Sequence, residues 1–384
     1  MRSAFLHKLS IFLLVTLPLL GLAAAIVLLW NRYVFWTDIV LLIGLYIPCA
    51  LGVTIGYHRM LTHKGFEAPE WLRAFFLILG VMAFEGAPIP WTATHIKHHA
   101  HSDEEDDPHS PIHGFWHAHM GWLFKKVNFA PAEQYAPHLL TDKTVLFVNR
   151  TVPLWMLLSL AIPFAIGGWT GLIWGGLVRI FFTTHVTWSV NSVCHTFGKR
   201  AFETTDASRN EWVVGMLALG EGWHNNHHAF PQSAFHGLRW WQFDLSGIII
   251  ASLEKLGVVW DVQRVSREVQ AAQHERSLKT QESIQLLTKD LWAAVETAQA
   301  QLNTSFWAAV SPATEKWGEM KRQAEVRLAE MRAALESASH YKKQKLQMWL
   351  METQQIIRNL QGALAIEAGM VSVSTSDEPQ RQAP

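Results

Sequence analysis

Histidine is the residue of this chain whose spacing could support chemistry. Of its 20 histidines, 17 lie between residues 58 and 236. Eight of these fall into three spaced groups: His58 and His63; His95, His98 and His99; and His224, His227 and His228. In a helix, the i, i+3, i+4 spacing of the last two groups places three imidazoles on one face. A single histidine is more often an ordinary polar or surface residue, but eight in three groups predict a metal site.

The type of donor indicates which metal would bind. Neutral imidazoles suit a borderline first-row metal such as iron, zinc or copper better than magnesium or calcium. Eight ligands exceed the needs of one ion, so two ions sharing the set is the simplest interpretation. Redox-active iron together with oxygen could attack an unactivated C–H bond, which zinc cannot do.

Asn191 and His195 extend this set of candidates. They are spaced i, i+4 and follow Trp188 by three and seven positions, so the three side chains would share one face of a helix. A polar pair near the end of a membrane helix often satisfies backbone groups instead. Because eight other candidates are present, we predict that the pair belongs to the metal site.

Long uncharged runs predict that the histidines belong to a membrane protein. No charged residue lies between Lys8 and Arg32 or between Asp38 and Arg59, and each run is about the ~20 residues that span a bilayer. A third run carries only one full charge, Arg179, and is divided by a Gly-Gly pair. We therefore predict an all-α membrane protein with four transmembrane helices, at about residues 9–30, 38–57, 152–167 and 170–190.

The distribution of lysine and arginine predicts that the histidines face the cytoplasm. The stretch 58–150 is rich in both residues, so the positive-inside rule places it, with the N-terminus, in the cytoplasm. Residues 71–91 are apolar but interrupted by Arg73, Glu85 and two prolines, and a crossing there would separate the first two histidine groups. We therefore predict an interfacial or partly buried helix at 71–91, and a multi-pass protein whose helical, histidine-rich di-metal domain is cytoplasmic.

The composition changes after Asp261. Apolar residues recur at heptad-like spacing among many charged residues and glutamines, which predicts amphipathic helices that form a hairpin or an oligomerising coiled coil. We divide the chain into a transmembrane and cytoplasmic domain at 1–261, an amphipathic helical extension at 262–370 and a disordered tail at 371–384. The formal net charge of zero argues against a nucleic-acid partner.

Other polar residues near the histidine groups receive ordinary interpretations. The acidic run from Asp103 to Asp107 is predicted to be a solvated loop rather than a ligand set. Five further histidines are predicted to support the ligand imidazoles or to lie at the surface. These are His101, His109, His113, His117 and His119.

The sequence resembles the integral-membrane fatty acyl desaturases, most closely the Δ9 acyl-CoA and acyl-lipid group. The resemblance covers about residues 10–250, and its combined motifs are highly specific although each is short. The motifs are His58-Arg59-Met60-Leu61-Thr62-His63, His95-Ile96-Lys97-His98-His99, Trp188-Ser189-Val190-Asn191-Ser192-Val193-Cys194-His195 and His224-Asn225-Asn226-His227-His228.

The resemblance implies a di-iron centre and its ligands. One iron would take His58, His63, His95, His99 and His227, and the other His98, His195, His224 and His228. Asn191 would act through a bound water, and Trp188 would contact the substrate.

The residues that would bind the acyl carrier differ from the family pattern. Similar acyl-CoA desaturases carry an Arg-Asp pair before the first histidine of the second group, where this chain has Ala93-Thr94. Lys125 and Lys126 could bind a phosphate of CoA or of a phospholipid, or could lie on the anionic membrane surface. The acyl carrier therefore stays open.

The resemblance implies an oxygen-dependent desaturase that introduces a cis double bond, at Δ9, into a saturated acyl chain carried on CoA or a lipid. The reaction uses O2 and two external electrons, yet the chain has no Gly-x-Gly-x-x-Gly loop and only two cysteines. We therefore expect a separate electron donor of the ferredoxin, rubredoxin or cytochrome b5 type, with a reductase. The alternatives are a membrane di-iron hydroxylase of acyl or alkyl chains and a metal transporter or sensor, in which ionisable residues would line the spans.

Overall fold

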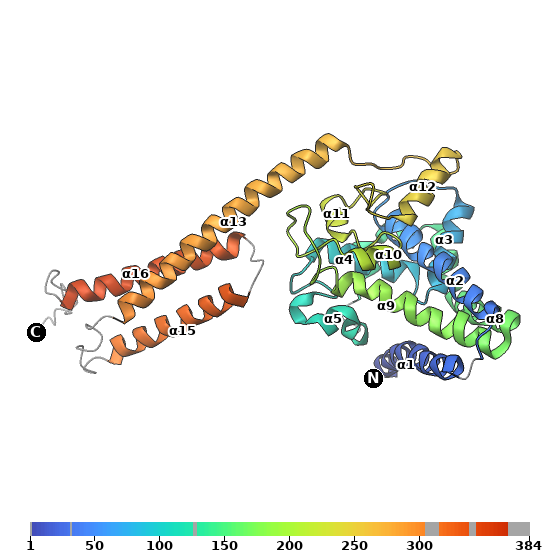
Figure 1. Cartoon of the computed structure of the whole chain (residues 1–384), viewed down its shortest axis with the longest axis horizontal. Coiled ribbons are helices and arrows are strands. Elements are labelled where there is room, and N and C mark those ends of the chain that lie inside the picture. The colour runs from blue at the N-terminus through green and yellow to red at the C-terminus, as the bar shows by residue number, and fades with distance from the viewer. Residues whose placement is uncertain (1, 31–32, 126–128, 304–314, 338–342, 368–384) are drawn as a thin grey trace, which may run out of the picture. The chain divides into compact units, whose positions relative to one another are not determined.

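The computed structural model of the chain describes residues 2–30, 33–125, 129–303, 315–337 and 343–367. These residues fold into helices, and the described ranges contain no strand beyond isolated bridges. This confirms the predicted all-α class. The chain divides into two compact units, residues 1–274 and 275–384 (Figure 1), and the first unit carries all three histidine groups.

Three helical runs among the described residues are long and apolar enough to cross a membrane: Phe5–Leu29, Trp36–Thr62 and Val152–Ser192. The first lies in α1 (Arg2–Trp30), and the second consists of α2 (Trp36–Leu51) and the π-helix η1 (Gly52–Thr62). The third consists of α8 (Val152–Gly171), the π-helix η6 (Leu172–Val178) and α9 (Arg179–Ser192). The sequence predicts four spans, two of them within this third run.

The third run of 41 residues folds back on itself near Gly168. Gly168 has φ 58° and ψ −144°, a conformation that glycine adopts without the steric cost of a side chain. Beyond Gly168 the chain comes back beside the first arm: a Cβ built on Gly175 would lie 2.9 Å from the Cβ of Pro163. A straight helix would separate residues twelve apart by about 18 Å. The run is therefore a helical hairpin, and it turns where the Gly-Gly pair predicts a turn.

Arg179, the charged residue of this run, is fully buried. Its guanidinium donates to the carbonyls of Gly175 and Met82 and to both the carbonyl and the hydroxyl of Ser159. A buried charge is tolerated where its donors have acceptors. Arg179 thus links both arms of the hairpin to the end of α3.

Residues 71–91 form most of α3 (Glu70–Met82), a turn, and the start of α4 (Pro88–His101). α3 is not one of the candidate spans, and it buries one face that includes Phe76 and Leu77 against η1. In the turn, Phe84 and Gly86 have φ values of 66° and 94°, which let the chain reverse between the two helices. α4 then carries the second histidine group.

The other helices of the first unit are short. One apolar core joins η1, α3, α4, α7 and α12, for example through Ile55, Leu77, Ala93, Val148 and Ile250. This core holds η1 and α4, which carry two of the histidine groups, against each other. The short helices are η2 (Pro111–His113), α5 (Phe115–His119), η3 (Gly121–Phe124), α6 (Ala132–Tyr135), η5 (Pro137–Leu140), α7 (Lys143–Arg150), α10 (Trp212–Leu217), α11 (His224–Ala229) and α12 (Leu245–Lys255).

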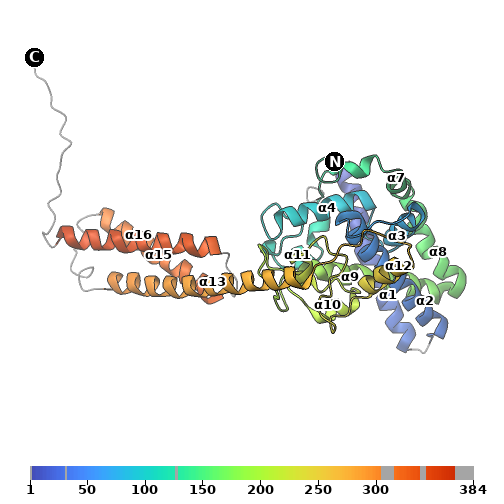
Figure 2. The ribbon, with the colours of Figure 1, turned by 90° about the horizontal axis from the view of Figure 1, so that it is seen from above.

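The second unit contains most of α13 (Arg267–Leu302), together with α15 (Glu315–Ser337) and α16 (Lys343–Glu367). The three helices lie side by side (Figures 1 and 2). Leu291 of α13, Leu328 of α15 and Leu346 of α16 meet in one apolar cluster, so the heptad-like stripe is covered within the chain. The tail predicted at 371–384 lies outside the described residues.

Candidate metal centre

The structure brings nine of the predicted histidines into two adjacent clusters. The first cluster contains His58, His63, His95, His99 and His227, and the second contains His98, His195, His224 and His228. Within each cluster, one ring nitrogen of every histidine lies within 4.8 Å of the others. These are the two sets that the resemblance implies, although binding of a metal to them stays a proposal.

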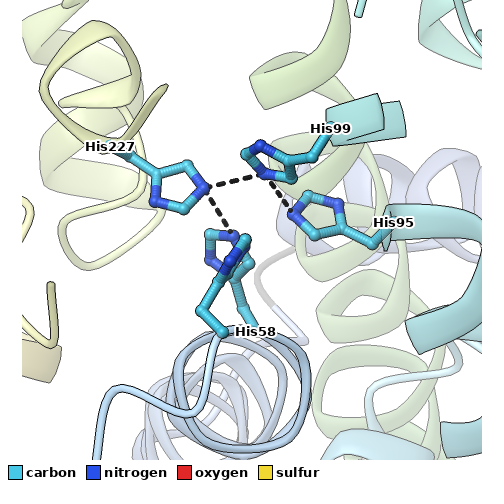
Figure 3. A group of neighbouring side chains, drawn as sticks. His58, His95, His99 and His227 are labelled. Atoms are coloured by element: carbon cyan, nitrogen blue, oxygen red, sulfur yellow. Dashed lines mark hydrogen bonds between the residues drawn. The ribbon is translucent and has the colours of Figure 1, made fainter. Parts of the chain in front are cut away.

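In the first cluster, the Nε2 atoms face one another. The Nε2 of His227 lies 3.1 Å from that of His58 and 3.0 Å from that of His99, and the Nε2 of His99 lies 3.2 Å from that of His95 (Figure 3). His63 completes the group, with its ring centroid 4.8 Å from that of His58. Three elements that are distant in sequence, η1, α4 and α11, therefore supply one site.

The π-helical geometry of η1 explains how His58 and His63 reach the same cluster. Residues five apart in an α-helix point to different faces, whereas a π-helix forms its hydrogen bonds from i to i+5. The amide of His63 donates to the carbonyl of His58 at 3.1 Å, which continues the π pattern and turns both rings to one side. The five-residue spacing is thus compatible with a shared site.

The other two groups divide their histidines between the clusters in the same way. In α4, His95 and His99 belong to the first cluster and His98 to the second. In α11, His224 and His228 belong to the second cluster, where their Nε2 atoms are 3.0 Å apart, and His227 belongs to the first. Each i, i+4 pair serves one cluster, and the residue between them serves the other. The two helices therefore connect the clusters into one centre.

His195 lies just beyond α9 and completes the second cluster. Its Nε2 is 3.0 Å from the Nε2 of His224. Asn191 and Trp188 precede it on α9 and line the cavity described below. Asn191 therefore faces the same cavity as His224 of the second cluster, and its predicted action through water stays a prediction.

Four buried or partly buried carboxylates hold the outer nitrogens of these histidines. The Nδ1 of His58 lies 2.5 Å from Glu221, and that of His228 lies 2.7 Å from Asp206. The Nδ1 of His98 lies 3.0 Å from Asp107, and that of His195 lies 3.0 Å from Asp103. Such carboxylates orient metal-binding imidazoles and fix their tautomer.

The interpretation of the acidic run as a solvated loop is wrong for Asp103 and Asp107. Asp107 is only 3% exposed, and both of its oxygens contact the Nδ1 of His98. Two successive turns, from His101 to Glu104 and from Glu104 to Asp107, fold the run back onto α4. Residues 104–106 are exposed, as predicted. Sequence alone does not reveal that the two ends of the run point inward.

Sequence reasoning also missed Asp206, Glu221 and His236. Glu221 stands three residues before His224, which is a usable signal because carboxylates often support ligand histidines. Asp206 lies 22 residues from His228, and no local pattern connects them. His236 is fully buried, with its Nδ1 3.2 Å from Glu221. The sequence marks it only as a histidine that stands apart from the spaced groups.

An ion network lies behind Glu221. Arg59 is fully buried and donates to Glu221, Asp244 and the carbonyl of Ala234. Burial alone would raise the pKa of Glu221, but His236, His58 and Arg59 hold it well below its usual value. Glu221 is therefore ionised at neutral pH, and it accepts the Nδ1 proton of His58.

The protonation of the inner nitrogens tests whether a cation fits. Burial and neighbouring histidines lower the pKa of His224 and His227 well below that of a free imidazole, so both are neutral. His195 differs: burial lowers its pKa, but Asp103 together with Asp206 and Asp107 outweighs burial, so the pKa is raised. The carboxylates accept the Nδ1 protons of His195 and His228. When either ring is neutral, its Nε2 therefore carries a lone pair, and this lone pair faces the Nε2 of His224. A single proton on the Nε2 of His224 could form a hydrogen bond with only one of these two lone pairs.

Buried nitrogens without a hydrogen-bond partner also indicate that a cation fits each cluster. The Nε2 atoms of His63 and His98 are buried and have no hydrogen-bond partner among the described residues. A buried unpaired acceptor costs about 1–3 kcal/mol, and a cation in each cluster would remove this cost. Imidazole nitrogens roughly 2.1 Å from an ion stand roughly 3.0–3.4 Å apart in octahedral or tetrahedral geometry, which matches the 3.0–3.2 Å contacts. The residues present therefore fit a pair of metal ions.

A cavity lined largely by apolar residues lies beside both clusters. His58 and His95 of the first cluster and His224 of the second form part of its wall, together with Trp188 and Asn191. Trp188 is 2% exposed and packs on Trp122 and Leu123. Of the two predicted phosphate-binding lysines, Lys125 is exposed and lines none of the described pockets, and Lys126 lies outside the described residues.

Comparison with known proteins decides the family. The sequence model of the fatty acid desaturases matches residues 33–246, which is more than half of the 384 residues. The chain belongs to the fatty acid desaturase family. This desaturase is therefore an oxidoreductase of fatty acyl metabolism, and the resemblance drawn from the histidine motifs is confirmed.

Relatives of the desaturase act on differently carried acyl chains. An acyl-CoA 5-desaturase of Anemone leveillei is 41% identical over 273 residues, covering 70% of this chain and 82% of the relative. An sn-1 stearoyl-lipid 9-desaturase of Anabaena variabilis is 39% identical over 236 residues, covering 61% and 86%. A hex-5-enoyl-[acyl-carrier protein] acetylenase of Moorena producens is 40% identical over 268 residues, covering 64% and 83%. Acyl substrates are common to all three.

Replacing Asp206 by asparagine is expected to lower metal affinity or turnover by about 10- to 100-fold, the usual effect of losing a carboxylate behind a ligand histidine. Asparagine retains the shape but not the charge that orients His228. Metal content after dialysis and turnover with a saturating electron donor measure the effect. Asp106→Asn, an exposed residue of the acidic run, is the matched control. Equal behaviour of the two variants would remove Asp206 from the centre.

Proposed function

We propose that the chain is an oxygen-dependent desaturase that introduces a cis double bond, at Δ9, into a saturated fatty acyl chain. The observation that carries the proposal is the cavity that reaches histidines of both clusters. An acyl chain in this cavity would lie with its methylene groups beside the centre. The largely apolar walls would exclude water, and Trp188 and Asn191 would face the chain.

The proposed cofactor is a pair of iron ions, one in each histidine cluster. With O2 and two external electrons, the iron pair would supply the oxidising power that an unactivated C–H bond requires. The protein's part is positioning, because Glu221, Asp103, Asp107 and Asp206 hold the histidine rings from behind. Asn191 would hold a water beside the second cluster. The electrons would come from a separate donor of the ferredoxin, rubredoxin or cytochrome b5 type.

We also propose that the chain crosses the membrane four times, with the histidine centre on the cytoplasmic side. The hairpin at Gly168 supports this proposal because it divides the longest apolar run into two segments that pack on each other. In this topology α1 and the α2–η1 run make the first two crossings, and the two arms of the hairpin make the third and fourth. The chain then returns to the side of the membrane that holds the histidines of η1 and α4. A protease-protection assay with tags in the 104–106 loop and at the C-terminus tests the topology.

Product analysis tests the proposed reaction. The protein is expressed in cells that lack a Δ9 desaturase, with a compatible donor and reductase, and the cellular fatty acids are analysed by mass spectrometry after derivatisation of the double bonds. We expect a cis-9 monoenoic acid that forms only with oxygen and not in a His98→Ala variant. A hydroxylated chain would instead support the hydroxylase alternative, and an acetylenic or displaced product would overturn the assignment of reaction or position.

A protein that ends at His274 is expected to retain its metal and, with a saturating artificial donor, its desaturation. Residues 275–384 form a separate compact unit, and both histidine clusters are built from residues that precede it. A protein that ends at Asp261 should be less stable, because the main chain of Gln263 bonds to Gly65 and Ala234 in the first unit. Metal analysis, turnover and thermal unfolding compare the two. Loss of metal from a monodisperse protein ending at His274 would make the second unit part of the catalytic fold, whereas a change in oligomeric state alone would support self-association through it.

A further inference from the structure

A second, apolar groove borders the cavity. Leu14, Leu17 and Pro18 of α1 form one wall, and Leu160, Leu177 and Ile180 of the hairpin form the opposite wall. All six residues belong to the candidate membrane spans, and α1 packs on η6 and α9 (Figure 1). In the proposed topology, the groove therefore lies at the depth of lipid acyl chains rather than at an aqueous surface.

The groove and the cavity share part of their lining. Glu85, Gly86, Leu123, Phe129 and Trp188 line both. The two groove walls belong to the candidate spans, and the cavity walls combine residues of these spans with histidines of both clusters. An acyl chain could thus pass from the bilayer to the metal centre beside Trp188 without crossing water.

The described lining of this junction offers no cationic side chain to a phosphate. Among the described residues, neither the groove nor the cavity is lined by a lysine or arginine. The one ionisable side chain that lines both is Glu85, an acid. CoA and anionic phospholipids carry phosphate groups that need cationic partners, so the junction suits an uncharged polar group.

Glu85 is suited to bind such a group. Its Oε1 is buried and has no hydrogen-bond partner among the described residues. Burial raises the pKa of Glu85 to about 8, although a hydrogen bond with Trp91 opposes the shift. At neutral pH the carboxyl is therefore mainly protonated and can donate a hydrogen bond to an ester carbonyl or a hydroxyl.

We propose that the acyl chain enters sideways from the bilayer through the groove between α1 and the α8–α9 hairpin, and that its carrier is a membrane lipid with an uncharged polar head group. Glu85 binds an uncharged oxygen of this lipid at the junction of groove and cavity. The inference rests on the proposed desaturase function and adds the carrier and the route.

The carrier is tested with the iron-loaded, full-length protein in vesicles that contain a saturating donor. Distearoyl monogalactosyl glycerol, distearoyl phosphatidylglycerol and stearoyl-CoA are compared. We expect the uncharged glycolipid to be desaturated at least roughly tenfold faster than the other two. A faster reaction with stearoyl-CoA overturns the inference but leaves the desaturase function standing, and equal rates with the two lipids overturn the uncharged head group.

Two variants test the route and the binding residue. Leu17→Trp fills the groove and should lower glycolipid turnover by at least roughly tenfold without changing iron content. Leu19→Trp is the matched control, since it is similarly exposed on the same helix, 52% against 47%, but does not line the groove. Glu85→Leu should raise the KM for the glycolipid roughly tenfold, the loss of about one hydrogen bond, and Glu85→Gln should restore it. Unchanged kinetics in Leu17→Trp would overturn the lateral route.

A binding measurement separates failure of the inference from failure of the function. A galactolipid with a photoactivatable group in its acyl chain is cross-linked to the full-length, metal-free protein, and the labelled peptides are mapped. We expect labels within residues 10–18 and 84–86, reduced by Leu17→Trp. Such labels without any desaturated product would refute the proposed reaction alone, whereas their absence would refute the route even if a product forms.

Discussion

A His227→Ala variant is expected to lose at least one metal ion and to retain less than about one hundredth of the wild-type turnover, since even a residue behind a ligand costs 10–100-fold when lost. His227 lies at the middle of the first cluster, where its Nε2 faces those of both His58 and His99. Its loss opens one side of this cluster, and α11 also positions two histidines of the other cluster. Metal analysis, Mössbauer spectroscopy and turnover measure the effect.

Membrane insertion of the variant should be unchanged, because insertion depends on the apolar spans rather than on the histidine centre. His274→Ala is the control, since His274 is not part of either cluster; its ring lies at hydrogen-bond distance from the carbonyl of Ala201 and edge-on to the ring of Phe202. Near-normal turnover of His227→Ala at full expression would remove His227 from the ligand set. A stoichiometry of one metal in active wild-type protein would refute the pair of ions.

Replacing Arg59 by methionine is expected to destabilise the first unit by about 3–5 kcal/mol, the typical cost of leaving a buried charge without its partner. Arg59 is fully buried between the carboxylates of Glu221 and Asp244. Asp244 also accepts from the amides of His236 and Gly247 and so holds the chain that follows α11. Without Arg59, two carboxylates would repel each other in a site closed to water. Denaturant unfolding of the metal-free protein measures the loss.

The matched control for this variant is Glu254→Gln, which weakens an ion pair between Glu254 and Arg264 on the surface of the same unit. Exposed pairs contribute little because water and salt screen them, so unfolding should hardly change. If Arg59→Met and Glu254→Gln unfold at the same denaturant concentration, the buried network does not stabilise the fold. The Arg59→Met variant should also bind metal more weakly, since Glu221 positions His58.

The histidine spacing was sufficient to predict which imidazoles of one helical turn lie on a common face. In α4 and α11 the spacing i, i+3, i+4 is a property of one helical turn, so it does not depend on the rest of the fold. The uncharged runs were equally local, and they predicted apolar helices where the structure has α1, the α2–η1 run and the α8–α9 hairpin. The turn at Gly168 followed from a Gly-Gly pair, because the conformation adopted there is one that glycine tolerates.

Tertiary structure alone decided what surrounds the histidines. Glu221 reaches His58 across 163 residues of sequence, and Asp103 reaches His195 across 92, so no local pattern could pair them. The same holds for the groove, whose walls come from α1 and the hairpin. The sequence by itself determined which donors each helix offers, since side-chain direction within a helix follows from backbone geometry. Which carboxylate stands behind each donor, and which apolar surface leads to it, depended on how distant segments pack, because packing is set by the whole chain at once.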